Sequence, residues 1–320
     1  MKKVPTVDIR SYTHGSIREQ AEFISIFGKA LQEYGFVIVE GHEINPSIIA
    51  DGYKQVQEFF SLPVNAKEKY FDKNGGGQRG YVVFGAENAK NSKQKDLKEF
   101  WHVGREQFED TAIEQQYPKN AWPNAEIPQF KDSMLNLYSS LDKFSRVLLC
   151  AVAEYLHLPK FTLADMAKDG NTILRALHYP PLSEEQFKSG AVRSAAHEDI
   201  NLITILCEAT ESGLQILTRE GKWLDVESSV GQMVVDAGDM LARITNDVIP
   251  STTHRVINPP NSKNLPRYSM PYFVHAAANC ELKIFENCLS PSRPAKYAPI
   301  LADEFLKQRL YELGLFDTPK

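Results

Sequence analysis

The chain has 320 residues, of which 42% are hydrophobic, and this is ample for a sizeable buried core in one large domain or two smaller ones. The formal net charge is −5, and the sequence pI is about 6.0. This mild acidity offers no basic surface for nucleic acid or anionic lipid, so we expect neither a nucleic-acid nor a membrane partner.

The N-terminal stretch "MKKVPTVDIRSY" has two lysines but lacks the apolar segment of a signal peptide. The longest purely apolar run, 147–153, is far too short to cross a bilayer. We therefore expect a cytoplasmic protein. The four cysteines form no C-x-x-C pair, and without a secretory context we expect free thiols rather than disulfides.

The first part of the chain alternates helix and strand patterns. Apolar residues at steps of three and four predict one helix before Gly35 and a second one ending near Pro63. Between them, the run "FVIV" at 36–39 predicts a buried strand. The motif "GGGQRG" fits G-x-G-x-x-G, but a charged stretch precedes it and the strand-like "YVVFG" follows it. Gly75, Gly77 and Gly80 therefore indicate a loop rather than a dinucleotide site.

A regular apolar stripe runs through the middle of the chain and predicts one long helix over 130–155. Such a stripe is typical of a scaffold helix that packs on a sheet.

The pattern changes after about residue 173, where short apolar runs alternate with turn residues. The runs that we interpret as strands are "ILRALHY", "INLITIL", "GLQILT", "MVVDAG", "MLARIT", "RYSMPYFV" and "LKIF". "LTREGKWLDV" predicts a hairpin that turns at Glu220–Gly221. Many short, evenly spaced strands favour an antiparallel barrel or a jelly roll of two sheets. The last segment, "ADEFLKQRLYELGL", is again helical in pattern.

The stretch "AAHEDINLITIL" combines polar residues with the start of an apolar run. On a strand, His197 and Asp199 would project to the same side, and Glu198 would point away. H-x-D alone is a weak signal, but His254 follows after several predicted strands, so a barrel can bring it back beside the pair. Two histidines and one carboxylate leave three positions open on an octahedral ion, which is the facial triad of non-haem Fe(II) oxygenases. Zinc would favour a tetrahedral site with fewer open positions.

A short distance after His254, Arg267 and Ser269 lie two apart on a strand-like run. A guanidinium can hold a carboxylate through two parallel hydrogen bonds, and a hydroxyl can add a third. Beside a metal, this pair would orient an anionic co-substrate.

Taken together, these segments resemble the isopenicillin N synthase-like branch of the 2-oxoglutarate/Fe(II)-dependent dioxygenases. The resemblance extends over nearly the whole chain. The segments that carry it include "VPTVDI", "EYGFVIVEGHEI", "DLKEFWHVGRE", "LRALHYPP", "HEDINLITIL", "GDMLARITNDVIPSTTHRV" and "RYSMPYFV". It implies a distorted double-stranded β-helix core with flanking helices and a helical N-terminal region. It also implies four segments: an N-terminal dioxygenase region at 1–125, a scaffold helix at 126–165, the catalytic core at 166–280, and a C-terminal strand and helix at 281–320.

The resemblance also implies roles for individual residues. His197, Asp199 and His254 match the iron ligands, and Arg267 and Ser269 match the pair that binds the distal carboxylate of 2-oxoglutarate. Tyr179 matches a tyrosine that often shares this carboxylate. Many plant relatives have an asparagine two positions before that tyrosine, and this chain has Leu177, which removes one polar contact to the co-substrate. The segments that approach the iron in relatives suggest the substrate contacts Arg79, Tyr81, Phe100 and Trp101.

The reaction that this resemblance implies needs Fe(II), 2-oxoglutarate and O₂, and it yields succinate and CO₂. The same step would hydroxylate, desaturate or close a ring in an unidentified small molecule. The R-x-S pair leaves one alternative open, because in isopenicillin N synthase it binds a substrate carboxylate and 2-oxoglutarate is not used. A non-enzymatic binding protein and a structural metal site are further alternatives, but an open triad suits neither. The sequence does not define the oligomeric state.

Overall fold

The computed structural model describes residues 3–72, 77–86, 97–181, 183, 193–258 and 264–312. Its helical segments are α1 (Arg10–Thr13), α2 (Ile17–Tyr34), α3 (Pro46–Phe60), α4 (Val64–Lys67), η1 (Glu68–Tyr70), α5 (Thr111–Glu114), α6 (Phe130–Tyr155), α7 (Thr162–Met166), α9 (Asp239–Ile244), η2 (Glu286–Cys288) and α10 (Ala302–Glu312).

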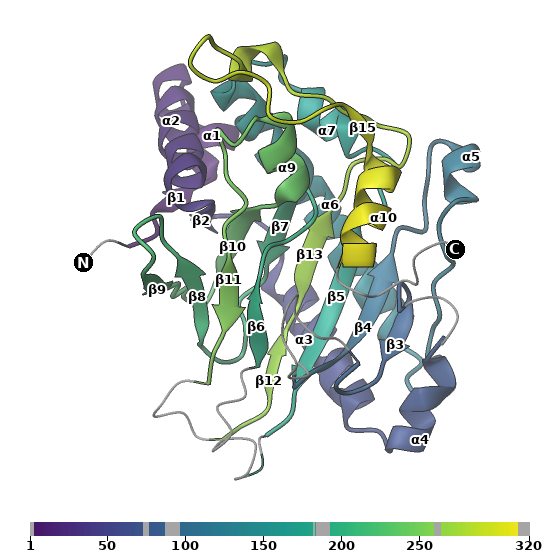
Figure 1. The fold of residues 1–320 in the computed structure, drawn as a ribbon. Helices are drawn as coiled ribbons and strands as arrows, with labels where there is room; N and C mark the ends of the chain where they lie inside the picture. Colours follow the sequence, from purple (N-terminus) through teal and green to yellow (C-terminus); the bar gives the residue numbers. More distant parts are fainter. Residues whose placement is uncertain are drawn as a thin grey trace.

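The strands alternate with these helices in the first half of the chain and follow one another in the second half (Figure 1). They are β1 (Thr6–Asp8), β2 (Phe36–Glu40), β3 (Gly80–Val82), β4 (Glu99–Gly104), β5 (Ile173–Tyr179), β6 (Ser194–His197), β7 (Ile203–Leu206), β8 (Leu214–Leu217), β9 (Trp223–Asp225), β10 (Gln232–Ala237), β11 (His254–Val256), β12 (Arg267–Ser269), β13 (Pro271–Val274), β14 (Glu281–Leu282) and β15 (Ile300–Leu301).

Two sheets face each other and form the core of the jelly roll. The larger sheet has the order β1-β2-β10-β7-β13-β5-β4-β3, with β12 paired to β5, and the smaller has the order β6-β11-β8-β9. Phe36, Ile38 and Val234 of the larger sheet pack against Leu214 and Ile216 of the smaller one. The predicted double-stranded β-helix core with flanking helices is therefore confirmed.

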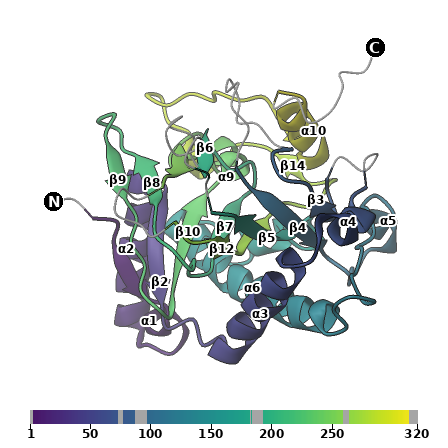
Figure 2. The same ribbon diagram turned by 90° about the horizontal axis from the view of Figure 1, so that it is seen from below.

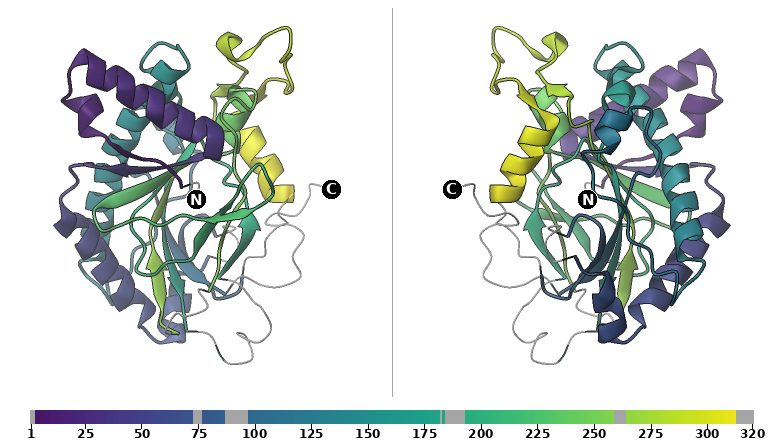
Figure 3. Two further views of the ribbon diagram at one scale, coloured as in Figure 1. Left: turned by 90° about the vertical axis from the view of Figure 1, so that its left-hand side faces the viewer. Right: turned by 90° about the vertical axis from the view of Figure 1, so that its right-hand side faces the viewer.

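The two faces of the larger sheet have different surroundings because alternate residues of a strand point to opposite sides. On the outer face, Trp101, Ala176 and Val235 belong to one apolar core with buried residues of α6 such as Leu137 and Leu141. Helices α2, α3 and α6 lie along this side of the sheet (Figures 2 and 3). The inner face looks toward the smaller sheet, and it is there that the polar residues of the site gather.

The local signals in the first half of the sequence define the elements well. Helix α2 begins with a capping box, in which Ser16 and Glu19 each satisfy the other's backbone N–H group. It ends at Gly35, whose φ of 68° is in the left-handed region that glycine adopts easily. The predicted strand at 36–39 is β2, and the predicted long helix over 130–155 is α6.

One predicted strand is wrong, because "MLARIT" forms helix α9 rather than a strand. Met240, Leu241 and Ile244 are buried at helical spacing, and Asp239 stands in the first turn. The backbone N–H of Asp239 donates to the carbonyl oxygen of Asp199 at 2.7 Å, so the loop after His197 holds this helix in place. The apolar run "MLARIT" is too short to show whether its residues repeat with the spacing of a helix or of a strand.

Other predictions about the chain are confirmed where the structure describes it. Gly80 begins β3 and no helix follows it there, while Gly75 lies outside the described residues. The hairpin turns at Gly221 between β8 and β9, and the four cysteines are free. Among the described residues, no helix combines the length and apolar character that crossing a membrane requires. The division into four segments stays a prediction.

Gly28 provides a test of the packing between α2 and α6. A β-carbon at Gly28 would lie 2.0 Å from Cγ of the Tyr155 ring, whereas one at Gly52 in α3 would lie 3.1 Å from a flexible leucine methyl. We predict that Gly28→Ala lowers the free energy of unfolding by about 1–3 kcal/mol through overpacking. Gly52→Ala serves as the matched control and should be close to neutral. Thermal and urea denaturation measure both, and equal stability of the two variants would contradict this packing.

Candidate metal centre

Three predicted ligands come together where β6 ends and β11 begins. His197 is the last residue of β6, Asp199 follows two residues later, and His254 is the first residue of β11. The antiparallel register places His254 directly opposite His197. Partners at such a position have side chains on the same face, so the pairing of these strands brings the two imidazoles together.

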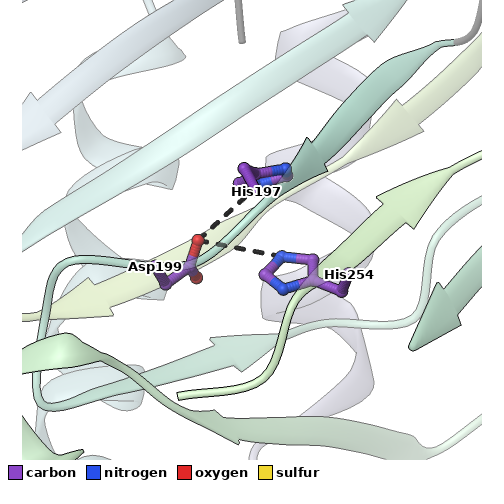
Figure 4. Close-up of side chains that lie close together, drawn as sticks. All are labelled: His197, Asp199 and His254. Atoms are coloured by element: carbon purple, nitrogen blue, oxygen red, sulfur yellow. Dashed lines mark ion pairs between the residues drawn. The ribbon is translucent and has the colours of Figure 1, made fainter. Parts of the chain in front are cut away.

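The side chains of the three residues converge on a common point (Figure 4). Oδ1 of Asp199 lies 3.7 Å from Nε2 of His197 and 3.8 Å from Nε2 of His254. All three potential ligand atoms lie within 4.8 Å of one another. Such spacing suits atoms that share one ion, because bonds of about 2 Å from a common centre separate neighbouring ligands by about 3 Å.

The backbone orients both imidazoles. Nδ1 of His197 lies 2.8 Å from the carbonyl oxygen of Ala195, and Nδ1 of His254 lies 3.1 Å from that of Thr252. A carbonyl only accepts hydrogen bonds, so each Nδ1 carries the proton and each Nε2 has a free lone pair. This is the arrangement of metal-binding histidines in proteins.

A buried hydroxyl orients the carboxylate in the same way. Thr204 on β7 donates a hydrogen bond to Oδ2 of Asp199, and Nδ2 of Asn201 donates to the Thr204 hydroxyl at 2.9 Å. Oδ1 of Asp199 is thereby left to face the histidines. Asp236 lies beside Thr204 across the β7–β10 pair, and burial raises its pKa well above the usual value. Asp199 therefore supplies the negative charge of this group.

The electrostatics of the three residues favour a cation. Burial alone would raise the pKa of Asp199, but His254, His197 and the Thr204 hydroxyl outweigh it, and this pKa lies below its usual value. Burial, with the nearby His254, lowers the pKa of His197 to about 4. Near neutral pH His197 is therefore a neutral imidazole and Asp199 a carboxylate, the protonation states that a divalent metal needs.

The same residues leave room for further ligands. Asp199 and His254 are each 8% exposed, but the side chain of His197 is 34% exposed, so the site opens on that side. Two nitrogen donors and one oxygen donor fit Fe(II) with three positions open. The open positions argue against a purely structural metal site.

The predicted anion clamp lies on the same inner face. Arg267 pairs with Tyr179 and Ser269 pairs with Leu177 across β12 and β5. Arg267 is only 2% exposed, donates to the Ser269 hydroxyl at 3.1 Å, and lies over the Tyr179 ring at 5.1 Å. Within the described residues no carboxylate forms an ion pair with Arg267, which leaves this buried cation available to an anion.

The four residues predicted to contact the substrate do not lie together in the structure. Phe100 lies on the inner face, in a cluster with Leu177 and Tyr179. Tyr81 and Trp101 lie on the outer face against α3 and α6, where strand alternation places them. The Arg79 guanidinium donates to Asn171 at 2.8 Å, and burial lowers its pKa to about 10. Of the four, only Phe100 shares a face with the clamp, and substrate contact by any of them stays a prediction.

Sequence reasoning missed the polar wall beside Phe100. Arg175 on β5 lies over the rings of Phe100 and Phe273, at 4.3 and 5.2 Å from their centroids. Its Nε donates to Nε2 of His102 at 2.6 Å. His275 comes two residues after Phe273, just past the end of β13, and Arg175 is among the charged groups around it. The inner-face positions of a strand could have been found by counting alternate residues from Tyr179 back to Arg175.

Comparisons with known proteins agree with this geometry. Two family models match the chain: the N-terminal region of non-haem dioxygenases in morphine synthesis at residues 4–125, and the 2OG-Fe(II) oxygenase superfamily at residues 170–276. A solved 2OG-Fe(II) oxygenase family protein from Caulobacter crescentus is 40% identical, covers 98% of this chain and 100% of its own, and superposes with a TM-score of 0.88. This chain belongs to the 2OG-Fe(II) oxygenase family.

Two further relatives show the range of this family. A full-length Neurospora crassa protein, solved in complex with alpha-ketoglutarate (2-oxoglutarate) and thymine, is 27% identical, and the match covers 96% of each chain with a TM-score of 0.86. The curated oxidoreductase hxnY of Emericella nidulans, described as 2-oxoglutarate-Fe(II) type, is 26% identical over 95% of this chain and 88% of its own. The protein is therefore an oxidoreductase that uses Fe(II) and 2-oxoglutarate, as predicted.

The Thr204 hydroxyl provides a test of how the carboxylate is held. We predict that Thr204→Val weakens Fe(II) binding by about 10–100-fold, because Asp199 loses the hydrogen bond that orients it. Thr204→Ser keeps the hydroxyl and should bind Fe(II) nearly as the wild type does. Anaerobic equilibrium dialysis measures the affinity, and circular dichroism checks the fold. Unchanged affinity in a folded valine variant would show that the hydroxyl does not orient Asp199.

Proposed function

We propose that His197, Asp199 and His254 hold Fe(II), and that Arg267 and Ser269, beside Tyr179, bind the distal carboxylate of 2-oxoglutarate. The protein then couples oxidative decarboxylation of this co-substrate to oxidation of a C–H bond in a small molecule. The observation that carries the proposal is the convergence of three oriented ligand atoms within 4.8 Å beside an open side of the site. When bound, the iron supplies the oxidative chemistry with O₂, and the protein supplies geometry.

Arg267 and Ser269 would orient the co-substrate by the charge of the guanidinium, which is buried away from water. Nε of Arg267 donates to the carbonyl oxygen of Glu211 at 3.0 Å, and Nη1 donates to Ser269, so the guanidinium has one fixed direction. A buried guanidinium holds a carboxylate more strongly than an exposed one because water competes less. Holding the distal end this way places the 2-oxo acid end near the metal ligands, which is catalysis by proximity.

The wall formed by Arg175, His102 and His275 with Phe100 and Phe273 supports a planar, polar substrate. Arg175 brings a guanidinium charge, while burial lowers the pKa of His275 to about 4 and so keeps it neutral. Nδ1 of His275 lies 3.2 Å from a backbone carbonyl, which leaves Nε2 as an acceptor. A guanidinium charge, an acceptor and aromatic faces together suit a flat molecule with hydrogen-bonding edges, such as the thymine bound to the Neurospora crassa protein.

A cavity of about 350 Å³ adjoins this wall, and His275, Asn171 and Tyr117 are among its lining residues. Asp303 and Lys307 of α10 border it from the other side. Its volume is in the range of small-molecule sites, but neither the three converging residues nor the clamp residues line it. We infer from relatives such as the one solved with thymine that the substrate is a small molecule, and that hydroxylation, desaturation and ring closure are all compatible with the site.

The alternative reaction is that of an oxidase that does not use 2-oxoglutarate. Relatives solved with alpha-ketoglutarate favour the co-substrate over this alternative. A requirement for 2-oxoglutarate in turnover distinguishes the two reactions directly, because only the oxygenase forms succinate.

The metal ligands provide the test of this proposal. We predict that His197→Ala and Asp199→Ala each abolish Fe(II)-dependent succinate formation from 2-oxoglutarate, since two ligands do not hold the ion in place. Glu198→Gln is the matched control, because Glu198 accepts a hydrogen bond from Thr253 at 2.9 Å and is not one of the three converging residues. Succinate is measured by chromatography. Formation at the wild-type rate in either alanine variant would refute the ligand assignment.

The clamp makes a separate prediction about the co-substrate. Arg267→Gln should raise the KM for 2-oxoglutarate by about 10–100-fold, because it removes a charge-assisted pair of hydrogen bonds. Arg255→Gln is the matched control, since Arg255 lies on β11 beside a ligand but is stacked on Trp223 at 3.9 Å. Succinate formation at varied 2-oxoglutarate concentration measures the effect. An unaltered KM in the Arg267 variant would place the clamp elsewhere.

A further inference from the structure

A second buried guanidinium lies close to the clamp. Arg193 immediately precedes β6, four residues before His197, and is 3% exposed. Its Nη2 donates to the carbonyl oxygen of Leu265 at 3.2 Å, two residues before Arg267 on the chain. Burial lowers the pKa of Arg193, and the nearby charge of Arg267 lowers it further. The two cations therefore lie close enough to repel each other.

Arg193 has unused hydrogen-bonding groups. Its Nε and Nη1 are buried and have no hydrogen-bond partner among the residues that the structure describes. Within the described ranges no carboxylate lies at ion-pair distance from it, although Glu211 and the Tyr179 ring are among the groups around it. A buried polar group without a partner is costly, and a buried cation without a partner is more so. Arg193, with these unpaired groups, lies near Arg267, which has no carboxylate partner among the described residues, and this indicates a site for an anion.

The partners of the clamp explain why a second cation is useful there. The position opposite Ser269 is Leu177, which has no donor, and it packs with Val82, Phe100 and Tyr179 in an apolar cluster. The resemblance to plant relatives indicated that one polar contact to the co-substrate is lost near this position. Arg193 precedes β6 of the smaller sheet and contacts the backbone just before Arg267, so its unpaired donors can supplement the clamp.

We propose that Arg193 is a second guanidinium of the co-substrate site and binds the distal carboxylate of 2-oxoglutarate together with Arg267. This inference rests on the proposed function, because it needs 2-oxoglutarate at the clamp. When 2-oxoglutarate binds, the negative charge of its distal carboxylate offsets the repulsion between the two guanidinium groups. They also select a 2-oxo acid with a distal carboxylate against one without it. Arg193 is thus a specificity-determining residue for the co-substrate.

Calorimetric titration of the Mn(II)-loaded protein tests this role without turnover. The ligands are 2-oxoglutarate and 2-oxobutyrate, which has no distal carboxylate. We expect Arg193→Met to weaken binding of 2-oxoglutarate by about tenfold or more and to leave binding of 2-oxobutyrate unchanged. Arg193→Lys should fall between the wild type and the methionine variant. Arg255→Gln, which removes an arginine stacked on Trp223, should bind both ligands as the wild type does.

Thermal unfolding separates this role from a structural one. Without ligand, Arg193→Met should be at least as stable as the wild type, because it removes an unpaired buried charge. Its stabilisation by 2-oxoglutarate should be smaller than that of the wild type. A role in holding the fold predicts the opposite, namely a lower melting temperature and equal weakening of both ligands, and that result would overturn the inference.

The outcomes also distinguish this inference from the proposed function. If Arg267→Gln weakens 2-oxoglutarate binding and Arg193→Met does not, the inference is overturned and the proposed clamp stands. If the Mn(II)-loaded wild type does not bind 2-oxoglutarate, the proposed function fails and the inference fails with it. Loss of affinity in both single variants, confined to the ligand with the distal carboxylate, supports both.

Discussion

The pairing of β6 with β11 is the constraint on which the rest of the site depends. It places His197 opposite His254, with ring centroids 4.3 Å apart. Two positive charges at this distance would repel each other, and Asp199 supplies the negative charge that makes the group attractive to a cation. A slip of one residue in this register would turn one histidine to the other face and leave no site.

The two faces of the larger sheet have different roles: the outer face contributes to stability, and the inner face carries the site. Its outer face carries the apolar core against α2, α3 and α6, and the charged Glu99 on that face is satisfied internally. Glu99 accepts hydrogen bonds from Lys67 at 2.8 Å, from Tyr81 at 2.5 Å and from His178 at 2.8 Å, and all of these residues are buried. The inner face has a different character, because the buried guanidinium of Arg267 on it bonds a backbone carbonyl and a hydroxyl and has no carboxylate partner among the described residues. Such a group lowers stability unless a ligand satisfies it, which is the pattern of a binding site.

Local patterns in the sequence were enough for the elements of the first half and for the general architecture. The capped helix before Gly35, strand β2 and the 26-residue helix α6 all have long, regular patterns. Helix α9 was wrong because six residues contain less than two turns, and an apolar run of that length fits a strand equally well. Strand β4 did not show in the sequence, since its outer face includes the charged Glu99 in place of an apolar residue.

The site was predictable where both functional residues lie two positions apart in one segment, as in H-x-D and R-x-S. It was not predictable where the contact joins distant strands. Arg175 and Arg193 gain their roles from His102 and Leu265, which are far away in the sequence, and nothing adjacent to them marks those neighbours. Thr204 bonds the nearby Asp199, but only the fold shows that its hydroxyl points to this carboxylate. Trp101, one residue from Phe100, lies on the other face of the sheet because consecutive residues of a strand point to opposite sides.

The central claim is that three side chains hold one ferrous ion and leave positions for 2-oxoglutarate to chelate. Anaerobic optical titration of the protein with Fe(II) and then 2-oxoglutarate tests it most directly. We expect a weak visible charge-transfer band that saturates at one equivalent of each per chain and is absent with either component alone. Tight binding of Fe(II) without any such band on addition of 2-oxoglutarate would contradict the account.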